Sequence, residues 1–202
     1  MVLFGQIIVG PPGAGKTFYC RGMQSFMEAI GRKCAIVNLD FANDTLPYAA
    51  AVDVRDLVSL ERVMEEFELG PNGGLVYCME YLLENIDWLL TRLKAVEESG
   101  VACVLFDCPG QVELYTHHTC VKSVVDALTK GQRVMGGTPA VALDCRLCSV
   151  HLVDSFYCWC VWVLHRSQLH HALFIIAHVS PMISLSMLIL MHRADQPKTL
   201  FC

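Results

Sequence analysis

The chain has 202 residues, which suffices for one to one and a half domains with a core. Its net charge of −5 and pI of about 5.9 give no basic footprint and argue against direct binding of nucleic acid. The start, MVLFGQIIVG, has neither a basic segment nor a cleavage site, so we expect no secretory signal. The eleven cysteines lack disulfide-like spacing, which favours reduced thiols and a cytoplasmic location.

The first predicted elements surround a glycine-rich string. Residues 4–9, FGQIIV, predict a buried strand, and residues 17–30 have the apolar spacing of a helix that Gly31 can end. Between them, GPPGAGKT fits G-x-x-x-x-G-K-[ST] at every fixed position, so its N–H groups can converge on phosphate oxygens. Lys16 would reach the β- and γ-phosphates, and Thr17 would bind Mg²⁺. The predicted nucleotide-binding residues are Gly10, Pro11, Pro12, Gly13, Ala14, Gly15, Lys16 and Thr17.

A second buried strand is predicted over residues 33–39, KCAIVNL, and it ends in Asp40. A carboxylate at the C-terminal end of a strand beside a P-loop is placed for Mg²⁺ or for its water. A helix cap or a turn is the alternative role for this aspartate. Residues 53–69 predict a charged surface helix, and GPNGG at 70–74, taken alone, predicts a loop.

The next predicted elements are a helix over residues 75–97 and a third buried strand, VACVLF, at 101–106. A D-x-x-G string follows at 107–110, which is the switch arrangement of P-loop GTPases. Its aspartate holds Mg²⁺ through water, and its glycine amide senses the γ-phosphate. Gln111 and Glu113 follow directly as polar groups able to orient a water.

Four strings together resemble one known family, the GPN-loop GTPases. They are GPPGAGKT, VNLD followed by Asn43, GPNGGLVYCMEY at 70–81 and LFDCPGQVELYTHH at 105–118. LPY at 46–48 and AVDV at 51–54 are similar to the second paralogous group of this family. The resemblance covers residues 3 to about 128.

The resemblance implies a P-loop NTPase of the α/β class, with a mostly parallel sheet flanked by helices. It implies GTP and Mg²⁺ as cofactors, with Thr17, Asp40 and Asp107 around the metal. It also implies a homo- or heterodimer with other GPN-loop GTPases, in which the GPN loop of one subunit reaches the γ-phosphate region of the other. The residues that it implies for catalysis are Asp40, Asp107, Gln111, Glu113 and, in trans from the loop Gly70-Pro71-Asn72, Asn72.

The cellular role that the resemblance implies is assembly and nuclear import of RNA polymerase II and related polymerases, including polymerase III, with transit into the nucleus. One departure lies inside the matched region, because Phe41 stands where the family usually has proline. Proline fixes φ and stiffens a turn, so we expect a looser hold on Asp40 without loss of a ligand.

The family pattern breaks in the C-terminal third. An N/S/T-K-x-D string that would read guanine is missing, because TKGQ at 129–132 lacks the aspartate. Residues 131–148 look like an insertion, SVHLVDSFY at 149–157 resumes a core strand, and residues 158–202 diverge as a hydrophobic tail. We therefore expect a P-loop GTPase domain over 1–157 whose C-terminal part is incomplete or irregular, as in an alternatively spliced or mis-assembled gene product.

Residues 172–191 contain no Asp, Glu, Lys or Arg and have the length of a membrane span, yet His178 and Pro181 interrupt them. A non-native tail is the favoured interpretation, a helix packed on the sheet is the second, and a membrane span is not expected. A zinc site formed by Cys145, Cys148, His151, Cys158 and Cys160 is disfavoured. His151 and its neighbours match a buried strand, and successive residues of a strand alternate between its faces.

GTP hydrolysis is the leading hypothesis for the function. The second is a nucleotide- or partner-binding module without turnover, because the base-recognition motif is missing. A different P-loop class, such as a kinase or an ATP-driven assembly factor, and a product that does not fold stably are the remaining alternatives. The GPN string disfavours the kinase, and exposed sheet edges would favour aggregation of an incomplete fold.

Overall fold

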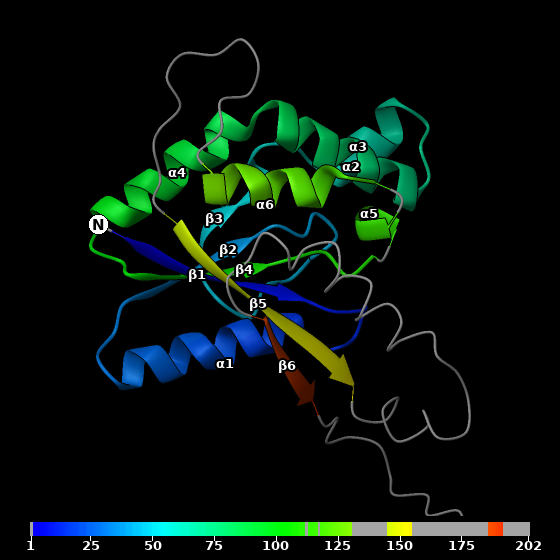
Figure 1. Ribbon diagram of the computed structural model, residues 1–202. Helices are drawn as coiled ribbons and strands as arrows, with labels where there is room; N and C mark the ends of the chain where they lie inside the picture. The colour runs from blue at the N-terminus through cyan, green and yellow to red at the C-terminus, as the bar shows by residue number, and fades with distance from the viewer. Residues whose placement is uncertain (1, 112, 117, 131–144, 155–185, 192–202) are drawn as a thin grey trace, which may run out of the picture.

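The structure is a computed structural model that describes residues 2–111, 113–116, 118–130, 145–154 and 186–191. Within this part of the chain, six strands form one sheet in the order β3-β2-β4-β1-β5-β6 (Figure 1). All neighbouring strands in that sheet are parallel. The strands are β1 (Leu3–Val9), β2 (Cys34–Asn38), β3 (Ala50–Asp53), β4 (Cys103–Asp107), β5 (Cys145–Asp154) and β6 (Ser186–Met191).

Helices cover both faces of this sheet. The described helices are α1 (Lys16–Ala29), the 3-10 turn η1 (Val54–Asp56), α2 (Leu60–Glu66), α3 (Pro71–Glu84), α4 (Ile86–Glu98), α5 (Glu113–Thr116) and α6 (Cys120–Lys130). Among the described helices, α1 lies on one face, whereas α3, α4 and α6 pack together on the other (Figure 1). The predicted α/β fold, a parallel sheet flanked by helices, is confirmed.

The central position of β1 explains why its sequence is apolar without alternation. β4 and β5 pair with its two edges, and helices pack over its two faces, so most of its side chains are buried, although Phe4 near its start is exposed. Ile7 packs into the cluster beneath α3, α4 and α6, and Ile8 packs into the cluster beneath α1. Gly5 is required because a Cβ at that position would collide with the side chain of Leu147 in β5.

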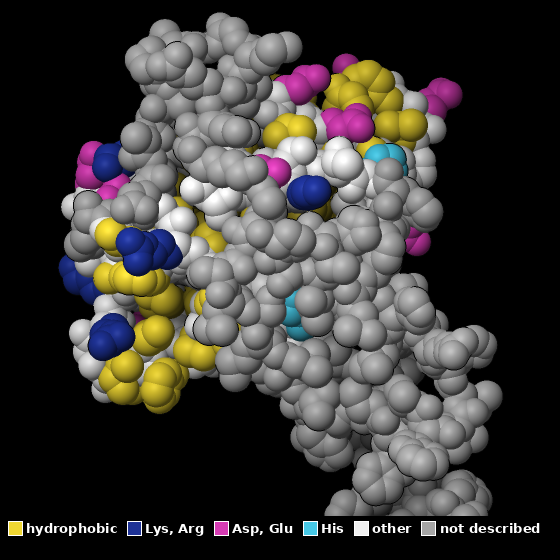
Figure 2. Space-filling view, in the orientation of Figure 1, with side chains coloured by type: hydrophobic (Ala, Val, Ile, Leu, Met, Phe, Trp, Pro, Cys, Tyr) yellow, Lys and Arg dark blue, Asp and Glu magenta, His cyan; other side chains and the backbone are white. Residues whose placement is uncertain are grey.

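Hydrophobic side chains also reach the surface on one flank, interspersed with Lys and Arg (Figure 2). Phe4, Phe26 and Ile30 are each more than half exposed. Scattered apolar side chains of this kind are ordinary on protein surfaces and identify no partner by themselves.

The structure corrects the interpretation of the GPNGG string as a loop. Pro71 is the first residue of α3, where its missing N–H costs nothing, and Gly70 caps the helix. Gly74 lets α2 approach closely, because a Cβ there would lie 2.9 Å from Leu60 Cδ1 and 2.9 Å from Met64 Cγ. Asn72 therefore belongs to the first turn of a helix and not to a loop.

Two other predicted helices also differ from the structure. The segment 53–69 is divided into η1 and α2, and it follows β3, a four-residue edge strand that the sequence analysis missed. The segment 75–97 is two helices, because Asn85 caps the end of α3 and the start of α4.

The C-terminal segments contribute two strands to the sheet. β5 begins at Cys145, inside the predicted insertion, and pairs with β1 from Leu3↔Cys145 to Val9↔His151. Cys145 and Cys148 are three residues apart on β5, so their side chains belong to opposite faces of the sheet and are poorly placed to share a zinc ion. Cys158 and Cys160 lie outside the described residues.

The stretch 172–191 ends as a strand. Its residues 186–191 form β6, which pairs in parallel with β5, so this portion is neither a membrane helix nor a helix packed on the sheet. The rest of that stretch, residues 172–185, lies outside the described part of the chain. Among the described helices, none combines the length and hydrophobicity needed to cross a membrane.

His151 ties β5 into the core. Its side chain is buried, and its Nε2 atom lies 2.6 Å from the Ser149 hydroxyl oxygen. Burial lowers the pKa of His151 from 6.5 to about 4. The imidazole is therefore neutral at pH 7 and resists protonation while the chain is folded.

This burial predicts acid sensitivity. Below its ordinary pKa of 6.5, His151 takes up a proton in the unfolded chain, whereas the folded chain does not bind it until about pH 4. The free energy of unfolding should thus fall on acidification through this window, by up to about 1.4 kcal/mol per pH unit. Urea unfolding at pH 7 and pH 5.5 measures this slope. His151→Gln should flatten it, and an equal slope in both proteins would contradict the assignment.

Candidate functional site

The predicted P-loop lies between the end of β1 and the start of α1. Gly13 and Gly15 have positive φ angles of 77° and 88°, which residues with a Cβ rarely adopt. Gly15 caps α1, so the unpaired N–H groups of the first helical turn face the loop. The eight predicted residues, 10–17, therefore form one cradle at a helix N-terminus, as the motif requires.

Lys16 is a buried cation inside this cradle. Its ammonium donates hydrogen bonds to the carbonyl oxygens of Gly10, at 3.1 Å, and Pro11, at 3.2 Å. Burial lowers the pKa of Lys16, while the carboxylates of Asp40 and Asp107 act against that lowering. A buried positive charge held only by carbonyl dipoles and nearby carboxylates is suited to an anionic ligand.

The D-x-x-G string packs directly against the P-loop. A Cβ on Gly110 would lie 2.9 Å from the Lys16 Nζ atom and 3.1 Å from the Cα of Pro12. A side chain at this position would therefore push the two motifs apart. At Gly110 the strings 10–17 and 107–110, far apart in sequence, come into contact.

Asp107 lies at the C-terminal end of β4 and is almost fully buried. It accepts a hydrogen bond of 2.7 Å from the Tyr48 hydroxyl at its Oδ2 atom. Burial raises the pKa of Asp107, although hydrogen bonds with Tyr48 and Thr17 act in the opposite direction. The Thr17 hydroxyl also accepts a bond of 3.3 Å from the Asn43 side-chain amide. Thr17 and Asp107 are thus held together by neighbours on the β2–β3 connection.

Asp40 completes the acidic side of the site. Its Oδ1 atom accepts a hydrogen bond of 3.0 Å from the Ala42 N–H, and its own N–H donates to the Asn38 side chain at 3.2 Å. Burial raises the pKa of Asp40, and the Lys16 charge opposes that effect. Phe41, which replaces the expected proline, is buried in the core, so its side chain anchors the turn after Asp40.

The donor set of these residues fits Mg²⁺. Magnesium prefers oxygen ligands, few of them from the protein and the rest from water and phosphate. A threonine hydroxyl and two carboxylates meet at the ends of adjacent strands and at the start of α1, with a buried lysine beside them. The side chains that would hold the ion are those of Thr17, Asp40 and Asp107.

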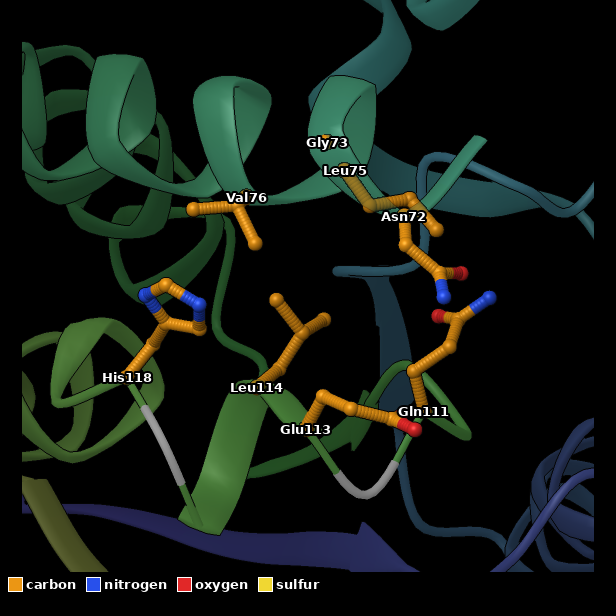
Figure 3. Close-up of a pocket in the computed structure, with 8 residues that line it drawn as sticks. All are labelled: Asn72, Gly73, Leu75, Val76, Gln111, Glu113, Leu114 and His118. Carbon is orange, nitrogen blue, oxygen red and sulfur yellow. The ribbon is translucent and has the colours of Figure 1, made fainter. Parts of the chain in front are cut away.

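The other predicted residues gather around a separate cavity of about 470 Å³. The amide ends of Asn72, in the first turn of α3, and Gln111 point toward one another across its mouth (Figure 3). Glu113 lies beside them at the start of α5. The cavity lining, which includes no P-loop residue among the described ones, is Asn72, Gly73, Leu75, Val76, Gln111, Glu113, Leu114 and His118.

This cavity brings together Asn72, Gln111 and Glu113, the residues expected near the attacking water. Gly70, Pro71 and Asn72 are all exposed, so the start of α3 is open to a second chain. The Gln111 Oε1 atom is buried without a hydrogen-bond partner in the described part of the chain. An unpartnered amide oxygen is a group able to accept a hydrogen bond from a water.

Tyr48 and Arg55 also support the site, although the sequence did not predict a role for them. Tyr48 was noted only as part of the LPY string, although its hydroxyl contacts Asp107. Arg55 donates to the backbone carbonyl oxygens of Asn43, at 2.6 Å, and Asp44, at 3.1 Å, while it forms an ion pair with Asp53. Neither contact follows from spacing, because each joins segments that meet only after folding.

Comparisons with known proteins identify the family of this chain. The family described as conserved hypothetical ATP-binding protein matches residues 8–200. GPN-loop GTPase 2 of Danio rerio is 54% identical over 155 residues, which are 77% of this chain and 45% of that protein. GPN-loop GTPase QQT1 of Arabidopsis thaliana is 51% identical over 157 residues, or 78% and 48%. GPN-loop GTPase 2 of Saccharomyces cerevisiae is 47% identical over 154 residues, or 76% and 41%.

The chain thus spans less than half the length of the curated relatives that it matches. The crystal structure of a GTPase in apo form from Pyrococcus abyssi is similar with a TM-score of 0.67 and 24% identity, and the match covers 95% of this chain and 67% of that one. At this identity the likeness supports the fold alone. The expected similarity to one paralogous group of a GTPase family is confirmed by the first set of relatives.

The Tyr48 contact gives a prediction for metal binding. Tyr48→Phe should weaken Mg²⁺ binding to the nucleotide-bound protein by about tenfold, because a hydrogen bond to a charged group is worth about 1.5–3 kcal/mol and fixes the Asp107 carboxylate. Electron paramagnetic resonance with Mn²⁺ as a substitute measures the affinity. Tyr19→Phe, which removes a hydroxyl bonded to Gln6, is the matched control. Equal Mn²⁺ affinities of the Tyr48→Phe and Tyr19→Phe variants would show that Tyr48 does not contribute to metal binding.

Proposed function

Because the chain belongs to the family of the GPN-loop GTPases, we propose that it binds GTP in its P-loop and hydrolyses it. The observation that carries this proposal is the contact of the P-loop with the D-x-x-G string at Lys16 and Gly110. It joins a phosphate cradle, a buried cation and two carboxylates in one place. Such a site serves phosphoryl transfer, which depends on positioning and on charge stabilisation.

Each group has a role in the proposed reaction. Lys16 neutralises charge on the β- and γ-phosphates, and the loop N–H groups fix their oxygens. Thr17, Asp40 and Asp107 would hold Mg²⁺, which supplies further charge neutralisation when bound. Water attacks the γ-phosphorus, and the bond to the bridging oxygen of GDP breaks. Gln111 and Glu113 lie on the segment after Gly110, and we assign them the orientation of that water.

The main test is nucleotide binding. Lys16→Ala should weaken binding of fluorescent GTP with Mg²⁺ by at least about a hundredfold, since a hydrogen-bonded charge of this kind is worth roughly 3 kcal/mol. Lys33→Ala is the matched control, because Lys33 is exposed and precedes β2 at the opposite end of the sheet. Unchanged binding after Lys16→Ala would refute the P-loop assignment. ATP in place of GTP measures the choice of base.

The choice of base is part of the proposal. A guanine-reading N/S/T-K-x-D string is not found in the sequence, and the matching family is described as ATP-binding. The curated relatives are named GTPases, which favours GTP. Tighter binding of ATP than of GTP would instead favour an ATP-driven assembly factor.

We further propose that the site is completed by a dimer, in which Asn72 of one subunit reaches the γ-phosphate region of the other. The support is the exposure of the start of α3 together with the family resemblance. The partner is a second copy or another GPN-loop GTPase.

Mixing two inactive variants tests this arrangement. The Asn72→Ala variant keeps an intact P-loop, and the Lys16→Ala variant keeps the side-chain amide of Asn72. Mixed dimers would regain one complete site, so an equal mixture should recover about a quarter of the wild-type GTPase rate, because half of the dimers are mixed. If Asn72 acts within its own chain, the mixture stays inactive. Asn85→Ala, at the far end of α3, should change neither outcome.

The cellular role that we propose is assistance in assembly and nuclear import of RNA polymerase II and III, from the cytoplasm with transit through the nucleus. Its support is the family resemblance. A second candidate function is a nucleotide- or partner-binding module without turnover, favoured by the missing base-reading string. Binding without hydrolysis, in a protein whose binding depends on Lys16, would select this second candidate.

A further inference from the structure

A group of three side chains outside the nucleotide site has the composition of a transition-metal site. Glu80 lies on α3, Cys120 is the first residue of α6, and His118 lies two residues before it. Their ligand atoms, a carboxylate oxygen, a thiol sulfur and an imidazole nitrogen, all lie within 4.8 Å of one another. None of the three belongs to the proposed catalytic groups.

The geometry points to a site for one Zn²⁺ or a similar borderline-soft divalent cation, held by Glu80, His118 and Cys120. Sulfur, imidazole nitrogen and carboxylate oxygen are the three donor types that zinc accepts, whereas Mg²⁺ takes oxygen. Three protein ligands leave a fourth position for water.

Two of the ligands are held in place before the ion arrives. Cys120 is 5% exposed and packs in the main core cluster, beside helices α3 and α4. His118 is half-buried, and its backbone N–H donates to the backbone carbonyl oxygen of Glu113 at 3.3 Å. Its ring extends from the segment before α6 toward α3, near Val76 (Figure 3). Glu80 lies one helical turn after Val76 on the same face of α3.

The third ligand supplies the adjustment. Ligand atoms around a tetrahedral zinc are roughly 3.5 Å apart, so the spacing of up to 4.8 Å must contract by about an ångström. Glu80 is exposed, and its side chain is therefore free to rotate toward the other two. Binding displaces the proton of the Cys120 thiol to solvent, leaving the thiolate as ligand.

The fourth position would open toward the cavity that His118 lines together with Asn72 and Gln111. An ion bound here would join α3, whose first turn carries Asn72, to the segment that follows Glu113. It would therefore steady the two segments that line the cavity, without touching the P-loop.

Cobalt spectroscopy on the whole chain tests the site. The nucleotide-free protein, with excess Mg²⁺ to fill oxygen-ligand sites, is titrated with Co²⁺ and then with Zn²⁺. We expect a thiolate-to-cobalt charge-transfer band that saturates at one equivalent and disappears when Zn²⁺ displaces the cobalt. Cys120→Ser should abolish the band, while Cys148→Ser, which removes a partly exposed thiol of β5, should leave it unchanged.

Glu80 allows a second test with a substitution that leaves the hydrophobic core unchanged, because this ligand is exposed. Glu80→Gln should weaken Zn²⁺ binding by at least the roughly 10–100-fold that loss of a supporting group costs, and Glu84→Gln, one turn further along α3, should not. Both residues are exposed, so both variants should fold. Cobalt bound without a charge-transfer band, a band that survives Cys120→Ser, or equal Zn²⁺ affinity in Glu80→Gln and Glu84→Gln would overturn the proposal.

Discussion

The pairing of β4 between β1 and β2 is the constraint on which the site depends. Ile8 of β1 is in register with Asp107 of β4, and Asn38 of β2 is in register with the same residue. Leu39 N–H donates to the Asp107 carbonyl oxygen at 2.8 Å, and Cys108 N–H donates to the Ile8 carbonyl oxygen at 3.3 Å. Because all three strands are parallel, their carboxyl ends meet at one edge, where parallel α/β sheets bind ligands. A slip of one residue would turn Asp107 away from Thr17.

The strand on the other side of β1 contributes to the same edge. A Cβ on Gly10 would collide with the carbonyl oxygen of Leu152, near the end of β5. The P-loop therefore rests on a backbone that belongs to the C-terminal part of the chain. β5 lies partly within a segment that departs from the family pattern, yet it takes the position next to β1 that the sheet requires. Its apolar pattern explains this, since Leu147, Val150 and Leu152 are all buried.

Sequence alone predicted the parts of the site whose residues are neighbours in the chain. The P-loop and the D-x-x-G string are local motifs, and the strands before them are apolar runs, so their order and their contact could be inferred. The GPNGG string was predicted to be a loop because proline and glycine usually interrupt helices, but proline is tolerated in a first turn. β3 is an edge strand of four residues, which is too short for an apolar run or an alternation to identify it. The Tyr48 contact spans 59 residues, and no periodicity reports a contact of that kind.

The β2–β3 connection shows why the substitution of proline by Phe41 is compatible with an ordered site. Asn38 donates to the Asp40 carbonyl oxygen at 3.1 Å and to the Asp53 carboxylate at 3.0 Å, which ties the last residue of β2 to the last residue of β3. Arg55, in η1 directly after β3, adds bonds to the middle of the connection. With both ends fixed, the turn after Asp40 does not depend on a ring to limit φ. The burial of Phe41 then replaces the stiffness of proline by packing, and Asp40 keeps its place beside Lys16.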